Sequence, residues 1–242
     1  MEKYVVRNIE RPSQEIIDAY EKLDVSTVYE AQGKQGILDP VLKPILNNTM
    51  IVGPAVTVIC PAGDNLMIHA AIEVVKPGDI VVITTEGNNV LGMIGELIVT
   101  ALMKKGVKGI IMDSGIRDVR QIRNMGFPIW TREVLSQGAQ KMRGGWVNAP
   151  AVCAGVLIHP GDLIMADDDG VVVVKKEDLE KSLQLSKERV AKETGTLEKI
   201  ESGQISLDFY NLRPVLASEG VVYYDTEEER LAAKEGVVNG KA

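Results

Sequence analysis

Short runs of aliphatic and β-branched residues alternate with longer amphipathic stretches along this chain. The apolar runs have the composition of buried strands, whereas the stretches between them repeat apolar residues at helical spacing. Strands that alternate with helices in this way indicate an α/β domain rather than a helical bundle or a β-sandwich. The expected strands cover residues 51–60, 80–84, 109–112, 126–131, 151–158, 163–165 and 171–174.

The expected helices lie before and between these strands. The first covers residues 12–23, with Ser13 in the position of an N-cap, and a second short helix starts near Val25. Pro-Gly-Asp turns at 77–79 and 160–162 each lead into an apolar strand. Three further helices are predicted, over residues 65–75, 95–105 and 118–124.

The composition changes at Lys176, where a long charged stretch begins. Its apolar residues Leu179, Leu183 and Val190 fall on one side of a helix, and this narrow stripe suits packing on the same domain or on a neighbouring subunit. We therefore expect an α/β domain over residues 1–175 and a C-terminal helical extension over 176–242. The polar end of the extension, residues 226–242, is expected to fray.

Composition and charge narrow the classes of function. With 242 residues and 45% apolar content, the chain can bury a full core. Its net charge of −7 argues against nucleic acid as a partner, because a polyanion requires a basic surface. Neither a signal peptide nor an apolar run of roughly 18 residues, the length that spans a bilayer, is evident. We therefore expect a soluble, cytoplasmic protein. Cys60 and Cys153 lie in apolar runs, so we expect both to be reduced thiols in the core.

Candidate chemistry concentrates between Gly95 and Asp118. Glu96 lies 117 − 96 = 21 positions before Arg117, and Asp118 follows directly, so a helix and a returning strand can bring all three to one cleft. A single carboxylate such as Asp118, completed by waters, is a usual way to hold Mg²⁺ or Mn²⁺. The planar fork of Arg117 suits a carboxylate or an enolate oxygen.

The helix expected to begin at Gly95 adds backbone donors to this cleft. A helix that starts there leaves its first four N–H groups without a partner inside the helix, namely those of Gly95, Glu96, Leu97 and Ile98. Such groups can bind a small carboxylate. Combined with Arg117 and a metal at Asp118, they describe a pocket for a 2-oxo acid. The alternative is that Arg117 and Asp118 form a surface ion pair that caps the next helix.

Other polar clusters give weaker signals. Asp167-Asp168-Asp169 could suggest a metal site, but three successive carboxylates do not easily converge on one ion, and Gly170 favours a tight turn instead. His69 and His159 lack metal-ligand spacing, which favours structural roles for both. No glycine-rich phosphate-binding motif is found.

Several ordered segments of the chain resemble one known family. They include VYEAQGKQG, GELI, DSGIRDVRQIRNMGFPIW and LDFYNLR. The resemblance is to the divalent-metal-dependent 4-hydroxy-4-methyl-2-oxoglutarate / 4-carboxy-4-hydroxy-2-oxoadipate aldolases, which are related to the regulators of ribonuclease E activity (RraA-like). The matching segments cover most of the chain, at residues 28–36, 61–73, 95–98, 113–130, 152–174 and 207–213.

The motif of this family is an acidic residue, twenty intervening residues and then Arg-Asp. It falls on Glu96, Arg117 and Asp118, although the aldolases typically have Asp at the first position. The resemblance implies that the amides of residues 95–98 bind the carboxylate of pyruvate and that Arg117 faces its keto oxygen. It also implies that Asp118 is the direct ligand of Mg²⁺ or Mn²⁺.

The resemblance further implies an oligomer with shared sites. Glu30 and Glu193 resemble carboxylates that reach the waters of the metal from an adjacent subunit. The implied fold is a layered α/β/β/α sandwich of the phosphohistidine-swivelling (RraA-like) type with a C-terminal helical extension. The implied assembly is a homotrimer or homohexamer.

The implied activity is that of a class II pyruvate aldolase, a carbon–carbon lyase. Retro-aldol cleavage leaves the enolate of pyruvate, and decarboxylation of oxaloacetate through the same enolate is the expected side reaction. The competing interpretation is a non-catalytic regulator that keeps the scaffold and binds a ribonuclease or another protein. The presence of GELI, Arg117, Asp118 and the extended C-terminal region favours the aldolase.

Overall fold

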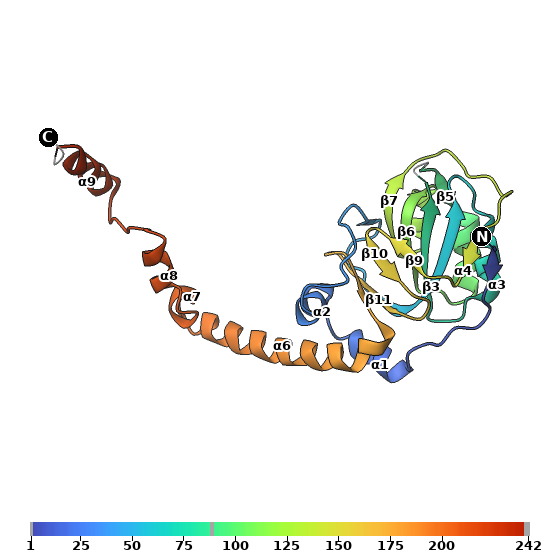
Figure 1. Cartoon of the computed structure of the whole chain (residues 1–242), viewed down its shortest axis with the longest axis horizontal. Coiled ribbons are helices and arrows are strands. Elements are labelled where there is room, and N and C mark those ends of the chain that lie inside the picture. The colour runs from blue at the N-terminus through green and yellow to red at the C-terminus, as the bar shows by residue number, and fades with distance from the viewer. Residues whose placement is uncertain (1, 88–89, 240–242) are drawn as a thin grey trace. The chain divides into compact units, whose positions relative to one another are not determined.

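The computed structural model of this chain describes residues 2–87 and 90–239 (Figure 1). It separates into two compact units, Met1–Val190 and Ala191–Ala242. The first unit has a mixed α/β fold built on a ten-stranded sheet. The expectation of an α/β fold is therefore confirmed.

Four neighbouring parallel strands form the centre of the sheet, in the order β3-β4-β6-β7. Short strands continue this sheet at its two edges, β8 and β1 beyond β3 and β2 beyond β7. The bounds are β1 (Tyr4–Val5), β2 (Lys43–Pro44), β3 (Ile51–Pro61), β4 (Ile80–Glu86), β6 (Gly109–Ile116), β7 (Ile129–Val134) and β8 (Trp146–Val147).

Both faces of the central strands are buried, and successive residues alternate between two cores. In β4, Val81 and Ile83 join the core formed with α3 (Leu66–Val74), α4 (Glu96–Lys104) and α5 (Val119–Asn124). Ile80 and Val82 join the opposite core, formed with the later strands of the unit. Burial on both faces explains why these strands read as continuous apolar runs. Cys60 and Cys153 are buried and free, as expected.

The later strands cover the second face of the sheet. β11 (Leu163–Ala166) pairs antiparallel with the first residues of β3 and with β12 (Val171–Val174). The single strand predicted over 151–158 is wrong, because the structure forms a hairpin of β9 (Ala151–Cys153) and β10 (Val156–Ile158). Ala154 and Gly155 both have positive φ at its turn. The N–H of Ala154 donates to Oδ2 of Asp113 at 2.7 Å, which fixes that turn.

The first two helices precede the central sheet in the chain. Helix α1 (Gln14–Tyr20) begins after Ser13, whose Oγ accepts a hydrogen bond from the N–H of Ile16 at 3.3 Å, as predicted for an N-cap. Helix α2 (Val25–Ala31) is capped in the same way by Asp24, which accepts from the N–H of Thr27 at 2.6 Å.

The two Pro-Gly-Asp turns do more than reverse the chain, because each aspartate is fully buried. Asp79 accepts two hydrogen bonds from Arg11, at 2.7 and 2.8 Å. Asp162 accepts from Nζ of Lys175 at 2.9 Å. The predicted turn at residues 167–169 is confirmed, since the N–H of Asp169 donates to Oδ1 of Asp167.

Helix α6 (Leu179–Glu201) begins in the first unit and carries the chain into the second. No described side chain from Ala191 to Lys234 is buried. Helix α9 covers Glu227–Asn239 within the segment that was expected to fray, and residues 240–242 lie outside the described part. The remaining helices are η1 (Lys176–Asp178), α7 (Ser206–Phe209) and α8 (Arg213–Ser218).

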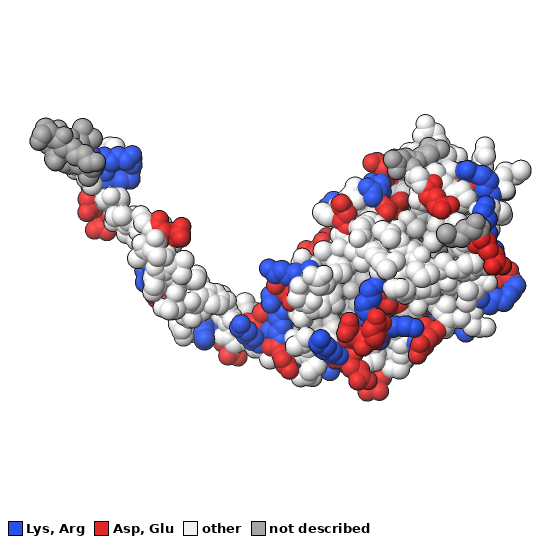
Figure 2. All heavy atoms as spheres, in the orientation of Figure 1, with Lys and Arg blue, Asp and Glu red and all other residues white. Residues whose placement is uncertain are grey.

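Charged side chains of both signs are interspersed on the face shown in Figure 2. Among the described helices, none combines the length and the apolar content needed to cross a membrane.

Candidate active site

One strand pairing brings the candidate residues together. Strand β5 (Gly92–Ile94) runs parallel to the end of β6, with Ile94 opposite Ile116. The N–H of Arg117 donates to the carbonyl of Ile94 at 2.8 Å. The chain leaves β5 directly into α4 and leaves β6 directly into Arg117 and Asp118. The two segments therefore meet at the carboxyl ends of parallel strands, where α/β proteins bind their ligands.

Asp118 has an unusual backbone conformation that directs its side chain. It lies in the left-handed region, with φ of 58° and ψ of 30°, and it precedes α5 without making a side-chain cap to that helix. Its Oδ2 instead accepts a hydrogen bond from the N–H of Glu96, at 3.2 Å. The carboxylate is thus turned toward the first turn of α4, and of the alternative only the surface ion pair with Arg117 is found, without the side-chain cap to α5.

Arg117 and Asp118 form a loose, half-exposed pair. Nε of Arg117 lies 3.7 Å from Oδ2 of Asp118, and the two side chains are 47% and 39% exposed. A pair with this exposure contributes little to the stability of the fold.

Gly95 leaves the space that this arrangement occupies. A Cβ at this position would lie 2.2 Å from Oδ2 of Asp118 and 3.2 Å from Nε of Arg117. Its φ of −140° is open to any residue, so the requirement is for space and not for backbone freedom. The close contact between α4 and Asp118 therefore depends on the absence of a side chain at residue 95.

The first turn of α4 supplies two unused backbone donors rather than the four predicted. The N–H of Glu96 bonds to Asp118, and the N–H of Ile98 donates to the carbonyl of Gly95 at 3.1 Å. The N–H groups of Gly95 and Leu97 have no partner within the described residues. Sequence reasoning missed the local contacts that satisfy the other two.

These groups open into a cavity of about 170 Å³. Arg117, Asp118 and the start of α4 form one part of its lining, and residues of β5, of the start of α3 and of the loop after β7 form the rest. Glu96 lies at its edge with an exposed side chain. The structure therefore brings Glu96, Arg117 and Asp118 to one cavity, as the spacing predicted.

The fit of a divalent metal rests on Asp118. No group of three or more His, Cys, Asp or Glu that could hold an ion occurs in residues 2–87 and 90–239. A single accessible carboxylate nevertheless matches Mg²⁺, which keeps several waters and is usually bound through one or two carboxylates plus oxygens of the substrate. The donor set fits a hard cation that is completed by water and substrate.

The two glutamates expected from a neighbouring subunit lie elsewhere in the chain. Glu30, on α2, does not line the cavity and pairs with Lys34 at 3.6 Å and Arg189 at 3.8 Å. Glu193 belongs to the second unit, in the part of α6 beyond Val190. The first unit alone therefore completes only part of the predicted set.

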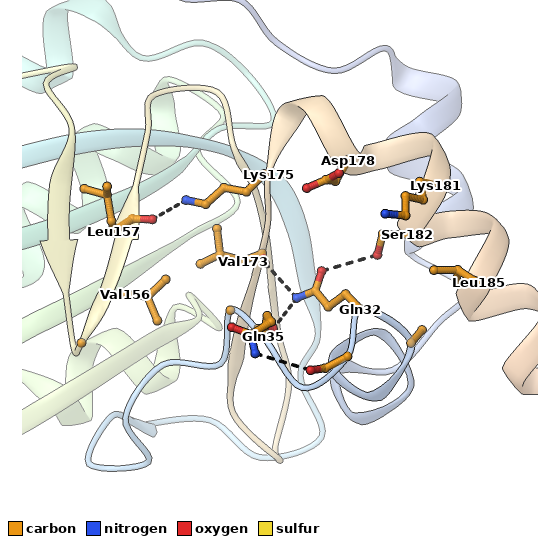
Figure 3. A pocket seen from close by; sticks show the side chains of 14 residues that line it. Gln32, Gln35, Val156, Leu157, Val173, Lys175, Asp178, Lys181, Ser182 and Leu185 are labelled. Carbon is orange, nitrogen blue, oxygen red and sulfur yellow. Dashed lines mark hydrogen bonds between the residues drawn. The ribbon is translucent and has the colours of Figure 1, made fainter.

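A larger cavity of about 650 Å³ lies between the end of α2, the β9–β10 hairpin and the start of α6 (Figure 3). Gln32 and Lys175 of its lining already bond to the protein, whereas the charged side chains of Asp178 and Lys181, which also line it, make no hydrogen bond or ion pair within the described residues. Nε2 of Gln32 donates to the carbonyls of Gln35 and Val173, at 2.6 and 3.1 Å, and Nζ of Lys175 donates to Asp162 and to the carbonyl of Leu157.

Solved structures share this fold. An uncharacterized protein from Pseudomonas syringae superposes with a TM-score of 0.72 at 26% identity, over 81% of this chain and 92% of that one. Streptomyces coelicolor RraAS2, described as an unusual member of the RNase ES inhibitor RraA family, gives a TM-score of 0.69 at 27% identity. That match covers 81% of this chain and 99% of RraAS2.

Relatives found by sequence belong to the same group of proteins as these structures. A protein of Halalkalibacterium halodurans that is provisionally named 4-hydroxy-4-methyl-2-oxoglutarate aldolase is 37% identical over 154 residues, which are 64% of this chain and 73% of that protein. The RraA-like family, described as Aldolase/RraA, matches residues 14–173. This match spans both the cavity at Asp118 and the sheet that positions it, and the chain therefore belongs to the RraA-like family.

Proposed function

We propose that this protein is a divalent-metal-dependent aldolase. It cleaves 4-hydroxy-4-methyl-2-oxoglutarate or 4-carboxy-4-hydroxy-2-oxoadipate to pyruvate and a second 2-oxo acid. The observation that carries the proposal is the convergence of the Asp118 carboxylate, the Arg117 guanidinium and the unused N–H groups of α4 on one cavity. The name of the relative from Halalkalibacterium halodurans supports the same reaction class.

The first turn of α4 is suited to the carboxylate of the 2-oxo acid. The N–H groups of Gly95 and Leu97 are available, and the positive end of the helix dipole favours an anion there. With the carboxylate seated on this turn, the adjacent 2-oxo oxygen faces Arg117. The guanidinium then stabilises the negative charge that this oxygen gains as pyruvate enolate forms.

Asp118 would hold Mg²⁺ or Mn²⁺, which when bound supplies Lewis-acid stabilisation of the enolate. The bond between C3 and C4 of the substrate breaks after the C4 hydroxyl loses its proton. Glu96 lines the cavity with an exposed side chain, where it can orient the water that accepts this proton. Oxaloacetate decarboxylation follows as a side reaction, because loss of CO₂ produces the same enolate.

The remaining carboxylates come from another copy of the chain in this proposal. Glu30 and Glu193 approach the metal of an adjacent subunit in a homotrimer or homohexamer. Glu30 lies outside the cavity of its own unit, which supports a role between subunits rather than within one.

The alternative function is that of an RraA-like regulator which binds a ribonuclease or another protein. The similarity to Streptomyces coelicolor RraAS2 favours it. The two functions differ in one respect that is simple to test, since only the aldolase turns over a 2-oxo acid.

The first prediction concerns turnover. With Mg²⁺ or Mn²⁺, the protein should release pyruvate from 4-hydroxy-4-methyl-2-oxoglutarate, 4-carboxy-4-hydroxy-2-oxoadipate or oxaloacetate in a coupled assay, and EDTA should abolish the release. Arg117→Met should lower kcat by about 100- to 1,000-fold, because one preorganised donor to the enolate is lost. The matched control is Arg120→Met, an exposed arginine that does not line the cavity.

Two results would contradict the aldolase. One is the absence of pyruvate from all three substrates, which would favour the regulator. The other is activity that survives complete removal of the metal.

The second prediction concerns the close contact at Gly95. Gly95→Ala should lower kcat by about 100-fold, since the new methyl group displaces the Asp118 carboxylate and small misplacements are this costly. The melting temperature should change little, because the methyl group meets the end of a side chain. Gly144→Ala, whose Cβ would make only an ordinary contact at 3.4 Å, is the control and should keep full activity. Wild-type activity in Gly95→Ala would show that the contact is dispensable.

The third prediction tests sites shared between subunits. Arg117→Met and Glu193→Gln should each be nearly inactive alone. When the two variants are co-expressed with different tags and mixed oligomers are purified, part of the activity should return, because some interfaces combine an intact Arg117 with an intact Glu193. Mixed oligomers no more active than the parent variants would place both residues in one subunit's site or exclude Glu193 from it.

A further inference from the structure

The part of the cavity that is not formed by α4, Arg117 and Asp118 has a chemistry of its own. It is built from the start of α3, with Asn65 and His69, and from the loop that follows β7, with Ala139 and Lys141. None of these residues is required to bind pyruvate in the proposed reaction. Their placement raises the question of which portion of a substrate they contact.

The loop after β7 is fixed in place on both sides. On one side, the N–H of Gly92 donates to the carbonyl of Gln137 at 2.7 Å. On the other, Gln140 exchanges two backbone bonds, from its N–H to the carbonyl of Gly63 at 2.9 Å and from the N–H of Asn65 to its carbonyl at 2.8 Å. The loop therefore forms a defined wall of the cavity.

Asp64 anchors the same loop from within the protein. Its carboxylate is fully buried and accepts from the N–H groups of Met142 and Arg143, at 2.7 and 2.9 Å, and from the N–H of Leu66 at 3.0 Å. Burial by itself raises the pKa of Asp64, but these donors outweigh burial and hold the pKa below its usual value. The two residues that follow Lys141 in the chain are thus anchored by a charged carboxylate, which limits where Lys141 can lie.

Lys141 is the cation of this wall. Within the described residues it makes no hydrogen bond or ion pair, and its side chain is exposed. Partial burial, and then the positive charge of Lys141, lower the pKa of His69, so His69 is neutral at neutral pH. The wall consequently carries one positive charge that the protein does not neutralise.

Asn65 provides an independent sign of a missing ligand. It is 6% exposed, and its Nδ2 donates to the carbonyl of Met93 at 2.8 Å. Its Oδ1 is buried and has no partner in the part of the chain that the structure describes. A buried acceptor without a donor is costly, so Oδ1 requires a donor from a water or from a hydroxyl group of a ligand, separate from the carboxylate that a cation would bind.

We infer that Lys141 is a specificity-determining residue that binds the distal carboxylate of the substrate. The inference rests on the proposed function, which seats the 2-oxo-acid end of the substrate on α4 and Arg117. The far end of such a substrate must then lie along the opposite wall, where Lys141 supplies a charge for a carboxylate. The site therefore selects 2-oxo acids with a second carboxylate over 2-oxo acids with an apolar tail.

The test compares two ligands of equal chain length, 2-oxoglutarate and 2-oxopentanoate, which differ in the distal carboxylate. Their dissociation constants, and that of pyruvate, are measured by calorimetry on the full chain with Mg²⁺. The wild type should prefer 2-oxoglutarate by about 10- to 100-fold, the usual worth of a charged hydrogen bond. Lys141→Met should abolish the preference without weakening pyruvate binding, and Lys141→Arg should restore part of it.

Lys104→Met is the matched control, since it removes an equivalent charge at the other end of α4 and should keep the full preference. If pyruvate binds and Lys141→Met retains the preference of the wild type, the role of Lys141 is refuted while the proposed function stands. If the wild type binds neither pyruvate nor the two longer acids, the proposed function fails and the inference fails with it.

Discussion

The parallel pairing of β5 with the end of β6 is the constraint on which the candidate site depends. It places the start of α4 beside Arg117 and Asp118, and the Arg117 N–H bond to Ile94 fixes the register. Contact between the two segments is close enough that Gly95 can have no side chain. The left-handed conformation of Asp118 then turns its carboxylate toward α4 instead of the helix that it precedes.

This arrangement separates the cavity into two regions of different chemistry. One region combines a carboxylate, a guanidinium and helix N–H groups, the parts needed to bind a hard cation and an enolate. The other region contains Lys141, neutral His69 and the buried carbonyl oxygen of Asn65. A substrate with a 2-oxo acid at one end and a carboxylate at the other would occupy both regions in one orientation.

The sequence predicted those parts of the fold and of the site that depend on residues close together in the chain. The central strands, the start of α4 and the convergence of Glu96, Arg117 and Asp118 follow from periodicity and spacing, and the structure confirms them except at β7, which covers Ile129–Val134 instead of residues 126–131. The family resemblance is confirmed as well.

Features that depend on distant contacts could not be predicted. The hairpin at Ala154 requires a carboxylate from Asp113, and the wall that holds Lys141 requires Asp64, which is 78 residues from Met142 in the chain. Likewise, two of the four donors at the start of α4 are satisfied by contacts that only the folded chain shows, one to the side chain of Asp118 and one to the carbonyl of Gly95.

The most direct test of the proposed site is a crystal structure with Mn²⁺ and pyruvate, with the ion located by anomalous scattering. The account predicts an ion about 2.1 Å from a carboxylate oxygen of Asp118, with pyruvate seated on the first turn of α4. An ion bound away from Asp118, or pyruvate bound in another cavity, would contradict it.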